Sequence, residues 1–246
     1  MGISIQDMLG AATAIDTNVD VVFVIDGTQS MQPLIDKVKE LTISFRNDLE
    51  KELSKNQRRI AKLRVKVIVF RDYYVDAEYA MQETDFFELP EENDAFTRYV
   101  SSIKSGGGGD EPESGLEALA LAMNSDFVQE GTKKRHIIVL FTDASAHPLE
   151  MQKDGIPTNY PKWMYKSFDQ LGDAWGGDQE FLGATTQSIK FTKATKRLVL
   201  FAPSMYPWSQ IEQNFNNAIR SEMNKGNGGQ DLELDLVWKL LAYSMG

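Results

Sequence analysis

The chain contains no cysteine and only two histidines. Disulfide bonds, thiolate nucleophiles and zinc sites built on cysteine are therefore excluded, while the redox state of the compartment stays open. His136 begins an apolar stretch and His147 follows it, so we do not expect the two histidines to form a zinc site.

Positive charge is also scarce. Lys and Arg number 26 against 36 Asp and Glu, which gives a formal net charge of −10. Proteins that bind nucleic acid or anionic membranes generally depend on clustered Lys and Arg, so we expect neither kind of partner. The one basic run, at residues 133–135, directly precedes an apolar stretch. We interpret it as a solvated turn between a helix and a strand.

Long apolar runs are missing as well. No stretch approaches the ~18 consecutive apolar residues that span a bilayer. The first twenty residues lack the basic start and apolar run of a signal peptide. A myristoylation motif would need Ser or Thr where Gln6 stands. We therefore expect a cytoplasmic protein without membrane contact.

Four short segments are apolar and rich in β-branched residues, a pattern typical of parallel strands that are buried on both faces. They are residues 21–25, 65–70, 137–141 and 198–201. Residues 33–55 carry apolar side chains at steps of three or four, which predicts an amphipathic helix. Further helices are expected at 93–103, 114–127, 165–175, 208–223 and 232–244, and an edge strand within 77–89.

Strands that alternate with helices predict an α/β fold with a doubly wound, mostly parallel central sheet flanked by helices. We expect residues 1–17 to form an N-terminal lead segment and residues 18–246 a single domain that ends in helices. The glycine-rich residues 225–229 are interpreted as a short flexible connection within that domain.

Polar side chains follow three of the predicted strands at the point where each strand ends. Asp26, Thr28 and Ser30 follow the first strand, Arg71, Asp72 and Tyr73 follow the second, and Asp143 follows the third. Asp110 follows a run of four glycines that opens a helix. Because ligands of such sheets bind beyond the carboxyl ends of the strands, we expect these loops to converge.

Carboxylates and hydroxyls form a hard-oxygen environment, which suits Mg²⁺, Mn²⁺ or Ca²⁺ better than softer metals. Asp26, Thr28 and Ser30 alternate along the chain, so their side chains can point to one side. One carboxylate with neutral hydroxyls leaves a metal under-neutralised and open to an external carboxylate. We predict a site for Mg²⁺ or Mn²⁺, in preference to Ca²⁺, with Asp143 helping directly or through water.

Simpler roles exist for the same residues. Asp26 and Thr28 are common helix-capping residues, and Asp110 before Glu-Pro-Glu could also cap a helix. Arg71 and Asp72 could form a structural pair that braces the site, with a ligand role for Asp72 as the alternative.

Residues 19–31 resemble the first strand and the metal-ion-dependent adhesion site of von Willebrand factor type A domains. The family pattern is Asp-x-Ser-x-Ser, a Thr in a second loop and an Asp after a later strand. Thr28 stands in place of the first Ser and keeps the hydroxyl. Asp143, within Leu-Phe-Thr-Asp-Ala, matches the later Asp.

The second loop departs from the family pattern, because Gly-Gly-Gly-Gly-Asp-Glu-Pro-Glu at 106–113 contains no Thr. This version is similar to a microbial intracellular branch, which also carries Arg-Asp-Tyr like 71–73 and Thr-Asp-Ala-x-x-His like 142–147. Asp110 would then replace the missing Thr as a ligand. In this setting we interpret His147 as a hydrogen-bonding prop for its loop and not as a general base.

The resemblance implies a binding protein and not an enzyme, in which a protein partner supplies an Asp or Glu to the metal. One alternative is a scaffold of the same fold with a vestigial metal site. Another is a metal-dependent phosphohydrolase, whose two carboxylates would stand two residues apart; Val24 and Thr28 occupy those positions around Asp26. Partner identity and oligomeric state cannot be read from the sequence.

Overall fold

A computed structural model describes residues 16–54, 59–107, 111–149, 159–176, 192 and 194–245. The strands are β1 (Asp16–Asp26), β2 (Arg59–Phe70), β3 (Met81–Glu83), β4 (Phe87–Leu89), β5 (Lys133–Phe141), β6 (Lys196–Ala202) and β7 (Ala218–Glu222). The helices are α2 (Gln32–Ser54), α3 (Tyr73–Asp76), α4 (Asn93–Ser102), α5 (Gly115–Met123), α6 (Phe168–Gly176), α7 (Trp208–Asn214) and α8 (Leu234–Ser244). Two short 3₁₀ turns are η1 (Gln29–Met31) and η2 (Ala77–Tyr79).

The strands form one sheet in the order β3-β2-β1-β5-β6-β7, with β4 also paired to β2. β1, β2, β5, β6 and β7 are parallel, and only β3 and β4 run antiparallel to their neighbour. Asp26 at the end of β1 lies opposite Phe70 of β2, and Ile25 lies opposite Phe141 of β5. The loops that follow β1, β2 and β5 therefore leave the sheet at the same edge, as the sequence predicts.

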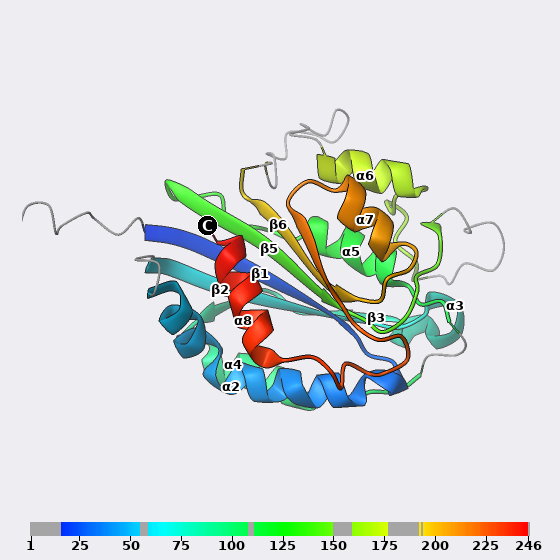
Figure 1. The fold of residues 1–246 in the computed structure, drawn as a ribbon, viewed down its shortest axis with the longest axis horizontal. Helices are drawn as coiled ribbons and strands as arrows, with labels where there is room; N and C mark the ends of the chain where they lie inside the picture. The colour runs from blue at the N-terminus through cyan, green and yellow to red at the C-terminus, as the bar shows by residue number, and fades with distance from the viewer. Residues whose placement is uncertain are drawn as a thin grey trace, which may run out of the picture.

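Helices cover both faces of this sheet (Figure 1). α2, α4 and α8 pack on one face, and α5, α6 and α7 pack on the other. Successive residues of β1 alternate between the two cores, with Phe23 in the first and Val22 and Val24 in the second. Because both faces are buried, the strand reads as a continuous apolar run. The predicted doubly wound α/β fold is confirmed.

Residues 208–223 were expected to form one helix, and this expectation is wrong. α7 ends at Asn214, the backbone turns through a positive φ of 56° at Asn217, and β7 follows. β7 pairs in parallel with β6 and extends the sheet. Pairing with an available sheet edge outweighs the helical propensity of this short segment, an outcome that local sequence does not reveal.

The basic run at 133–135 is not a turn. It forms the start of β5, where Lys133, Lys134 and Arg135 lie opposite Thr17, Asn18 and Val19 of β1. Long side chains let these residues pair their backbone inside the sheet while their charged ends stay near solvent.

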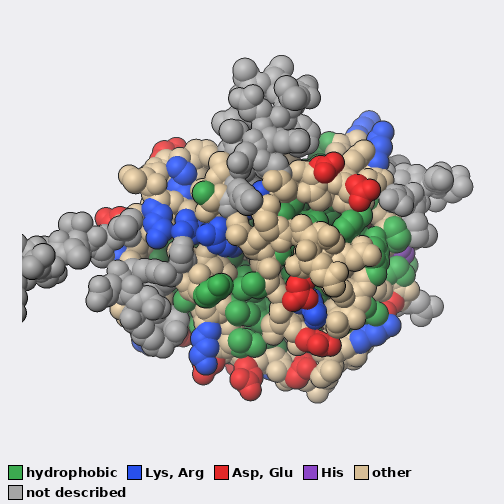
Figure 2. Space-filling model, turned by 45° about the horizontal axis from the view of Figure 1, so that its top comes forward, with side chains coloured by type: hydrophobic (Ala, Val, Ile, Leu, Met, Phe, Trp, Pro, Cys, Tyr) green, Lys and Arg blue, Asp and Glu red, His purple; other side chains and the backbone are tan. Residues whose placement is uncertain are grey.

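Most large apolar side chains are buried, including Trp175, Trp208 and Trp238. The exposed ones among the described residues are Val75, Tyr79, Trp163, Tyr206 and Tyr243. Figure 2 shows hydrophobic side chains beside a histidine at the right edge of the molecule, the side on which α3 lies in Figure 1. None of the helices in the described ranges has the length and apolar character that crossing a membrane requires.

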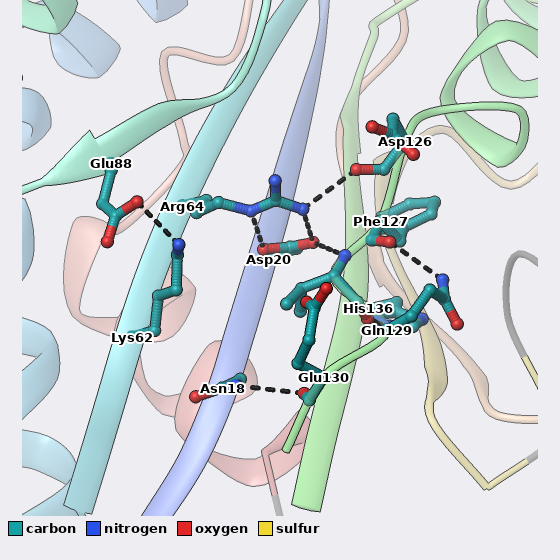
Figure 3. A network of polar contacts seen from close by, with 11 residues as sticks. Asn18, Asp20, Lys62, Arg64, Glu88, Asp126, Phe127, Gln129, Glu130 and His136 are labelled. Atoms are coloured by element: carbon teal, nitrogen blue, oxygen red, sulfur yellow. Dashed lines mark hydrogen bonds and ion pairs between the residues drawn. The ribbon is translucent and has the colours of Figure 1, made fainter.

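A polar network ties β1, β2 and β5 to the loop after α5 (Figure 3). Arg64 donates to both carboxylate oxygens of the buried Asp20, through Nε at 2.9 Å and Nη2 at 2.6 Å. The Val128 N–H donates to Asp20 Oδ2 at 2.6 Å, and the Val128 carbonyl lies 2.8 Å from Nε2 of His136. The carboxylate of Asp20 is therefore satisfied by a cation of its own chain, and it anchors the loop to the sheet.

Candidate metal site

Asp26 ends β1 and is completely buried. Its Oδ1 accepts from the backbone N–H of Thr28 at 2.9 Å and from the Thr28 hydroxyl at 2.6 Å. Its Oδ2 accepts from the Thr142 hydroxyl at 2.7 Å. These three donors are all neutral. Burial raises the pKa of Asp26 to about 6 against the lowering effect of these hydrogen bonds, and the negative charge of Asp143 raises it further.

Two further polar contacts connect the Thr28 hydroxyl to the loop that follows β5. Thr28 Oγ1 and Ser30 Oγ lie 3.3 Å apart, and Ser30 Oγ donates to Asp143 Oδ1 at 3.1 Å. The structure thus brings Asp26, Thr28, Ser30 and Asp143 together in one connected row of oxygens. Asp110, the fifth predicted ligand, lies outside the described residues.

Asp143 is held from its other side by the glycine-rich segment 225–229. Gly228 N–H donates to Asp143 Oδ2 at 2.7 Å, and Gly226 N–H donates to the Asp143 carbonyl at 3.1 Å. Gly228 has a φ of +59°, and a Cβ there would overlap the carbonyl oxygen of Ser30. Only glycine fits this close approach. Segment 225–229 therefore borders the site. Its interpretation as a flexible connection did not predict this role.

The second loop contributes a buried carboxylate at Glu113. Its backbone N–H donates to the Ser145 carbonyl at 3.0 Å and its carbonyl accepts from His147 N–H at 2.9 Å, which fixes the second loop to the third. Burial, followed by the negative charges of Asp26 and Asp72, raises the pKa of Glu113 to about 8. Its Oε2 has no hydrogen-bond partner among the described residues. Sequence reasoning singled out Asp110 in this loop and missed Glu113.

The side chain of Arg71 connects the loops around the site. Its guanidinium donates to the carbonyls of Gly27 at 3.1 Å, Tyr79 at 2.9 Å and Lys104 at 2.9 Å. The guanidinium thereby joins the first loop, the turn after β2 and the start of the second loop.

Asp72 has a different set of partners from Arg71, so the expected Arg71–Asp72 pair does not describe the bracing. Asp72 caps α3 by accepting from Tyr74 N–H at 3.0 Å. His147 Nε2 lies 3.2 Å from the Asp72 carboxylate, and the His147 ring contacts the ring of Tyr74 at 4.9 Å. His147 thus lies against α3, but neither of its ring nitrogens makes a hydrogen bond within the described residues, so the predicted hydrogen-bonding role is not seen.

The donor set consists of two carboxylates and two hydroxyls, which is the oxygen-only chemistry that Mg²⁺ and Mn²⁺ prefer. Within the described residues, no group of three or more His, Cys, Asp or Glu side chains is arranged to hold a metal. A site in this chain would therefore depend on the hydroxyls of Thr28 and Ser30. Both hydroxyls now donate their hydrogens to carboxylates, so each oxygen keeps lone pairs that can face a cation.

Comparisons with known proteins agree with this fold. A family model described as von Willebrand factor A domain matches residues 20–158, more than half of the chain. Alpha-protein kinase vwkA of Dictyostelium discoideum is 26% identical over 132 residues, which are 54% of this chain and 19% of that protein. The chain thus spans about a fifth of that relative's length.

Two solved structures show the same fold at low sequence identity. The pilus adhesin SpaC from Lactobacillus rhamnosus GG superposes with a TM-score of 0.53 at 12% identity, over 93% of this chain and 30% of that chain. Proximal thread matrix protein 1 from the mussel byssus gives 0.51 at 14% identity, over 93% of this chain and 49% of that chain. With the family match and the sheet topology in agreement, the chain belongs to the von Willebrand factor A domain family.

Proposed function

We propose that the chain is a metal-dependent protein-interaction module. It holds one Mg²⁺ or Mn²⁺ at Asp26, Thr28, Ser30 and Asp143, and the ion accepts an Asp or Glu side chain from a protein partner. The observation that carries this proposal is the connected row of oxygens from Asp26 to Asp143 at the carboxyl edge of the sheet.

The charge balance of the row supports a cation. Asp26 is fully buried, yet its hydrogen bonds come from Thr28 and Thr142, which are neutral. Buried charges are ordinarily paired or bound to metals, because an unpaired ion loses its hydration without compensation. A divalent ion would supply that compensation, and as a Lewis acid it would attract a further anionic ligand.

The residues of the row have separable tasks in this proposal. Asp26 and Asp143 provide the negative charge, and Thr28 and Ser30 provide neutral oxygens that leave the ion electrophilic. Gly228 N–H occupies Asp143 Oδ2 and so directs Oδ1 toward Ser30. In the second loop, Asp110 or Glu113 would take the place of the Thr of the family pattern.

We also propose that the chain belongs to the microbial intracellular branch of the family, and the Arg71-Asp72-Tyr73 stretch and the Thr142 to His147 stretch support this assignment. No catalytic role is assigned to the site. The module would act by recruiting its partner, within a cytoplasmic assembly whose other members remain to be found.

Calorimetric titration of the purified chain with Mg²⁺, Mn²⁺ and Ca²⁺ tests the metal. We expect Mg²⁺ and Mn²⁺ to bind, and Asp26→Asn to weaken binding by about a hundredfold or more, since it removes a charged ligand at the centre of the row. Asp36→Asn, on the exposed side of α2, is the matched control and should bind like the wild type. A wild-type chain that binds none of the three ions would instead favour a scaffold with a vestigial site.

Thermal melting provides a second readout. Saturating Mg²⁺ at ~100 times its Kd would stabilise the folded state by about 2.7 kcal/mol, because the ion binds only the folded chain. EDTA should remove this gain in the wild type and lower the stability of Asp26→Asn by at most about 0.4 kcal/mol, because a site a hundredfold weaker is at most about half occupied at that Mg²⁺ concentration. Equal melting temperatures with and without Mg²⁺ in the wild type would contradict the proposal.

A further inference from the structure

We infer that the turn from Tyr74 to Tyr79, formed by α3 and η2, contacts the partner residues on either side of the metal-bound carboxylate. These contacts would determine which partners bind. The partner segment that fits carries a single Asp or Glu with apolar and basic residues beside it, and few further acidic residues. This inference rests on the proposed function and specifies the class of partner for the same site.

The turn lies directly beside the loops of the metal site. Arg71 donates to the carbonyls of both Gly27 and Tyr79, so one guanidinium spans the first loop and the turn. On the other side, Gly107 of the second loop packs so closely on Asp76 that a Cβ there would overlap the carboxylate. A partner side chain that reaches the metal would therefore pass next to this turn.

The turn is anchored from within. Tyr73 is buried, its N–H donates to the buried Ser114 hydroxyl at 2.9 Å, and its ring packs against Tyr160 at 5.0 Å. The carbonyl of Ala77 accepts from the Asn159 side chain at 2.9 Å. An anchored turn presents its outward side chains in fixed positions, which lowers the entropy cost of binding.

Two of its outward side chains are large and apolar. Val75 is 58% exposed and Tyr79 is 62% exposed, although large apolar side chains are mostly buried in this molecule. Hydrophobic side chains also gather at this edge in Figure 2. Exposed aromatic residues at the rim of a binding site are common anchors of protein interfaces. Apolar partner residues on either side of the carboxylate would cover Val75 and Tyr79.

The charge of the same edge selects against an acidic partner. Glu78 is exposed on the turn, Asp76 is part of the turn, and Glu111 lies in the second loop beside it. Against these acids stand Lys104, Arg71, whose guanidinium is bound to three backbone carbonyls, and Lys225, which is already paired with Glu111 at 2.6 Å. The chain as a whole carries a net charge of −10. A metal ion can neutralise one incoming carboxylate, but further partner acids would meet like charge, whereas a Lys or Arg would meet Glu78.

Selection from a library of short random peptides displayed on phage tests this partner class. The Mg²⁺-loaded wild-type chain captures peptides, EDTA releases them, and the released pool is sequenced. We expect enrichment of one Asp or Glu with apolar and basic neighbours, and depletion of peptides with several acids. The strongest synthetic peptide should then bind the Val75→Ser/Tyr79→Ser variant about tenfold more weakly, while Mg²⁺ affinity stays unchanged. Tyr243→Ser, at the 74% exposed Tyr243 of α8, is the control and should bind like the wild type.

The possible outcomes separate the two proposals. Carboxylate-containing peptides without apolar or basic enrichment, or equal binding by the Val75→Ser/Tyr79→Ser variant, would overturn this inference and leave the metal site intact. A pool without carboxylate enrichment, or no peptide released by EDTA, would contradict the proposed function itself.

Discussion

β1 carries two fully buried carboxylates, Asp20 in its middle and Asp26 at its end, and they differ in the charge of their partners. Asp20 receives two hydrogen bonds from the guanidinium of Arg64. Asp26 receives its hydrogen bonds from Thr28 and Thr142, and none of those donors is charged. The same residue type on the same strand is thus paired with a cation of the chain at one position and with neutral donors at the other. Under the proposed function, the second position is the one that binds an external cation.

Under the proposed function, the charge of the hydrogen-bond donors would separate a structural carboxylate from a metal-binding one without reference to any family. Burial alone does not distinguish Asp20 from Asp26, because neither is exposed. The charge of the donors does, since an ion removed from water requires an opposite charge from somewhere. Four substitutions can break or sharpen the distinction.

The largest effect is expected for Asp20→Ala. The substitution leaves Arg64 without its carboxylate and Val128 N–H without its acceptor, and breaking a buried pair by removing one partner costs about 3–5 kcal/mol. Chemical denaturation should show this loss equally in EDTA and in Mg²⁺. Asp36→Ala, an exposed site on α2, is the control and should change stability by less than about 0.5 kcal/mol. A loss of stability that depended on Mg²⁺ would show that Asp20, like Asp26, is coupled to metal binding.

The next effect concerns Glu117, a buried carboxylate whose hydrogen bond comes from the Tyr160 hydroxyl at 3.0 Å. Burial raises the pKa of Glu117 to about 7, so the folded state binds a proton that the unfolded state has released above pH ~4.5. The stability due to this group is complete below pH ~4.5 and is lost as pH rises through about 7, at a cost of up to about 3 kcal/mol.

Glu117→Gln should therefore gain stability relative to the wild type between pH ~5 and pH ~8. Denaturation curves at both pH values measure the change, with Glu40→Gln on the exposed side of α2 as the control. If the difference in free energy of unfolding between Glu117→Gln and the wild type stayed constant across this range, the raised pKa of Glu117 would be contradicted.

A smaller effect is expected for Gly228→Ala. A left-handed backbone costs a residue with a Cβ about 1–2 kcal/mol, and here the Cβ would also overlap the Ser30 carbonyl. Gly226→Ala is a matched control, because Gly226 has a similar φ of +66° but nothing near its Cβ position. Both variants should lose stability, and only Gly228→Ala should also weaken Mg²⁺ binding, since its N–H would leave Asp143. Equal Mg²⁺ affinities in the two variants would remove segment 225–229 from the site.

The smallest effect is expected for Asp26→Asn in EDTA. An amide keeps one oxygen for Thr28, and its NH₂ can donate to the Thr142 hydroxyl, which has a second lone pair. We expect the free energy of unfolding to change by less than about 1 kcal/mol. A loss as large as that of Asp20→Ala would show that Asp26 is structural and that neutral donors do not mark a binding carboxylate.

The sequence predicts the parallel strands well, because burial on both faces leaves a continuous apolar run in β1, β2, β5 and β6. It also predicts the convergence of Asp26, Thr28, Ser30 and Asp143, which follows from parallel strands ending at one edge. β7 was missed because its pairing with β6 depends on a neighbour distant in sequence. The role of Gly228 was missed for a similar reason, since its contact with Asp143 spans 85 positions.

Glu113 shows a different limit. Local sequence places Asp110 and Glu113 in the same acidic loop and does not show that the side chain of Glu113 is buried. The bridge between Glu113 and Ala146 settles the position of Glu113, because it aligns the second loop with the third. Burial of that carboxylate is a property of the assembled loops and not of the Gly-Gly-Asp-Glu-Pro-Glu string.

The contacts of Arg71 affect which residues around the candidate site can be exchanged. Its guanidinium holds three loops by their carbonyl oxygens alone, at Gly27, Tyr79 and Lys104. A carbonyl is present whatever the side chain, so the residues at positions 79 and 104 can be exchanged without loosening the frame. Under the proposed function, partner specificity could then change, or be redesigned, one surface residue at a time while the arrangement of Asp26, Thr28, Ser30 and Asp143 is kept.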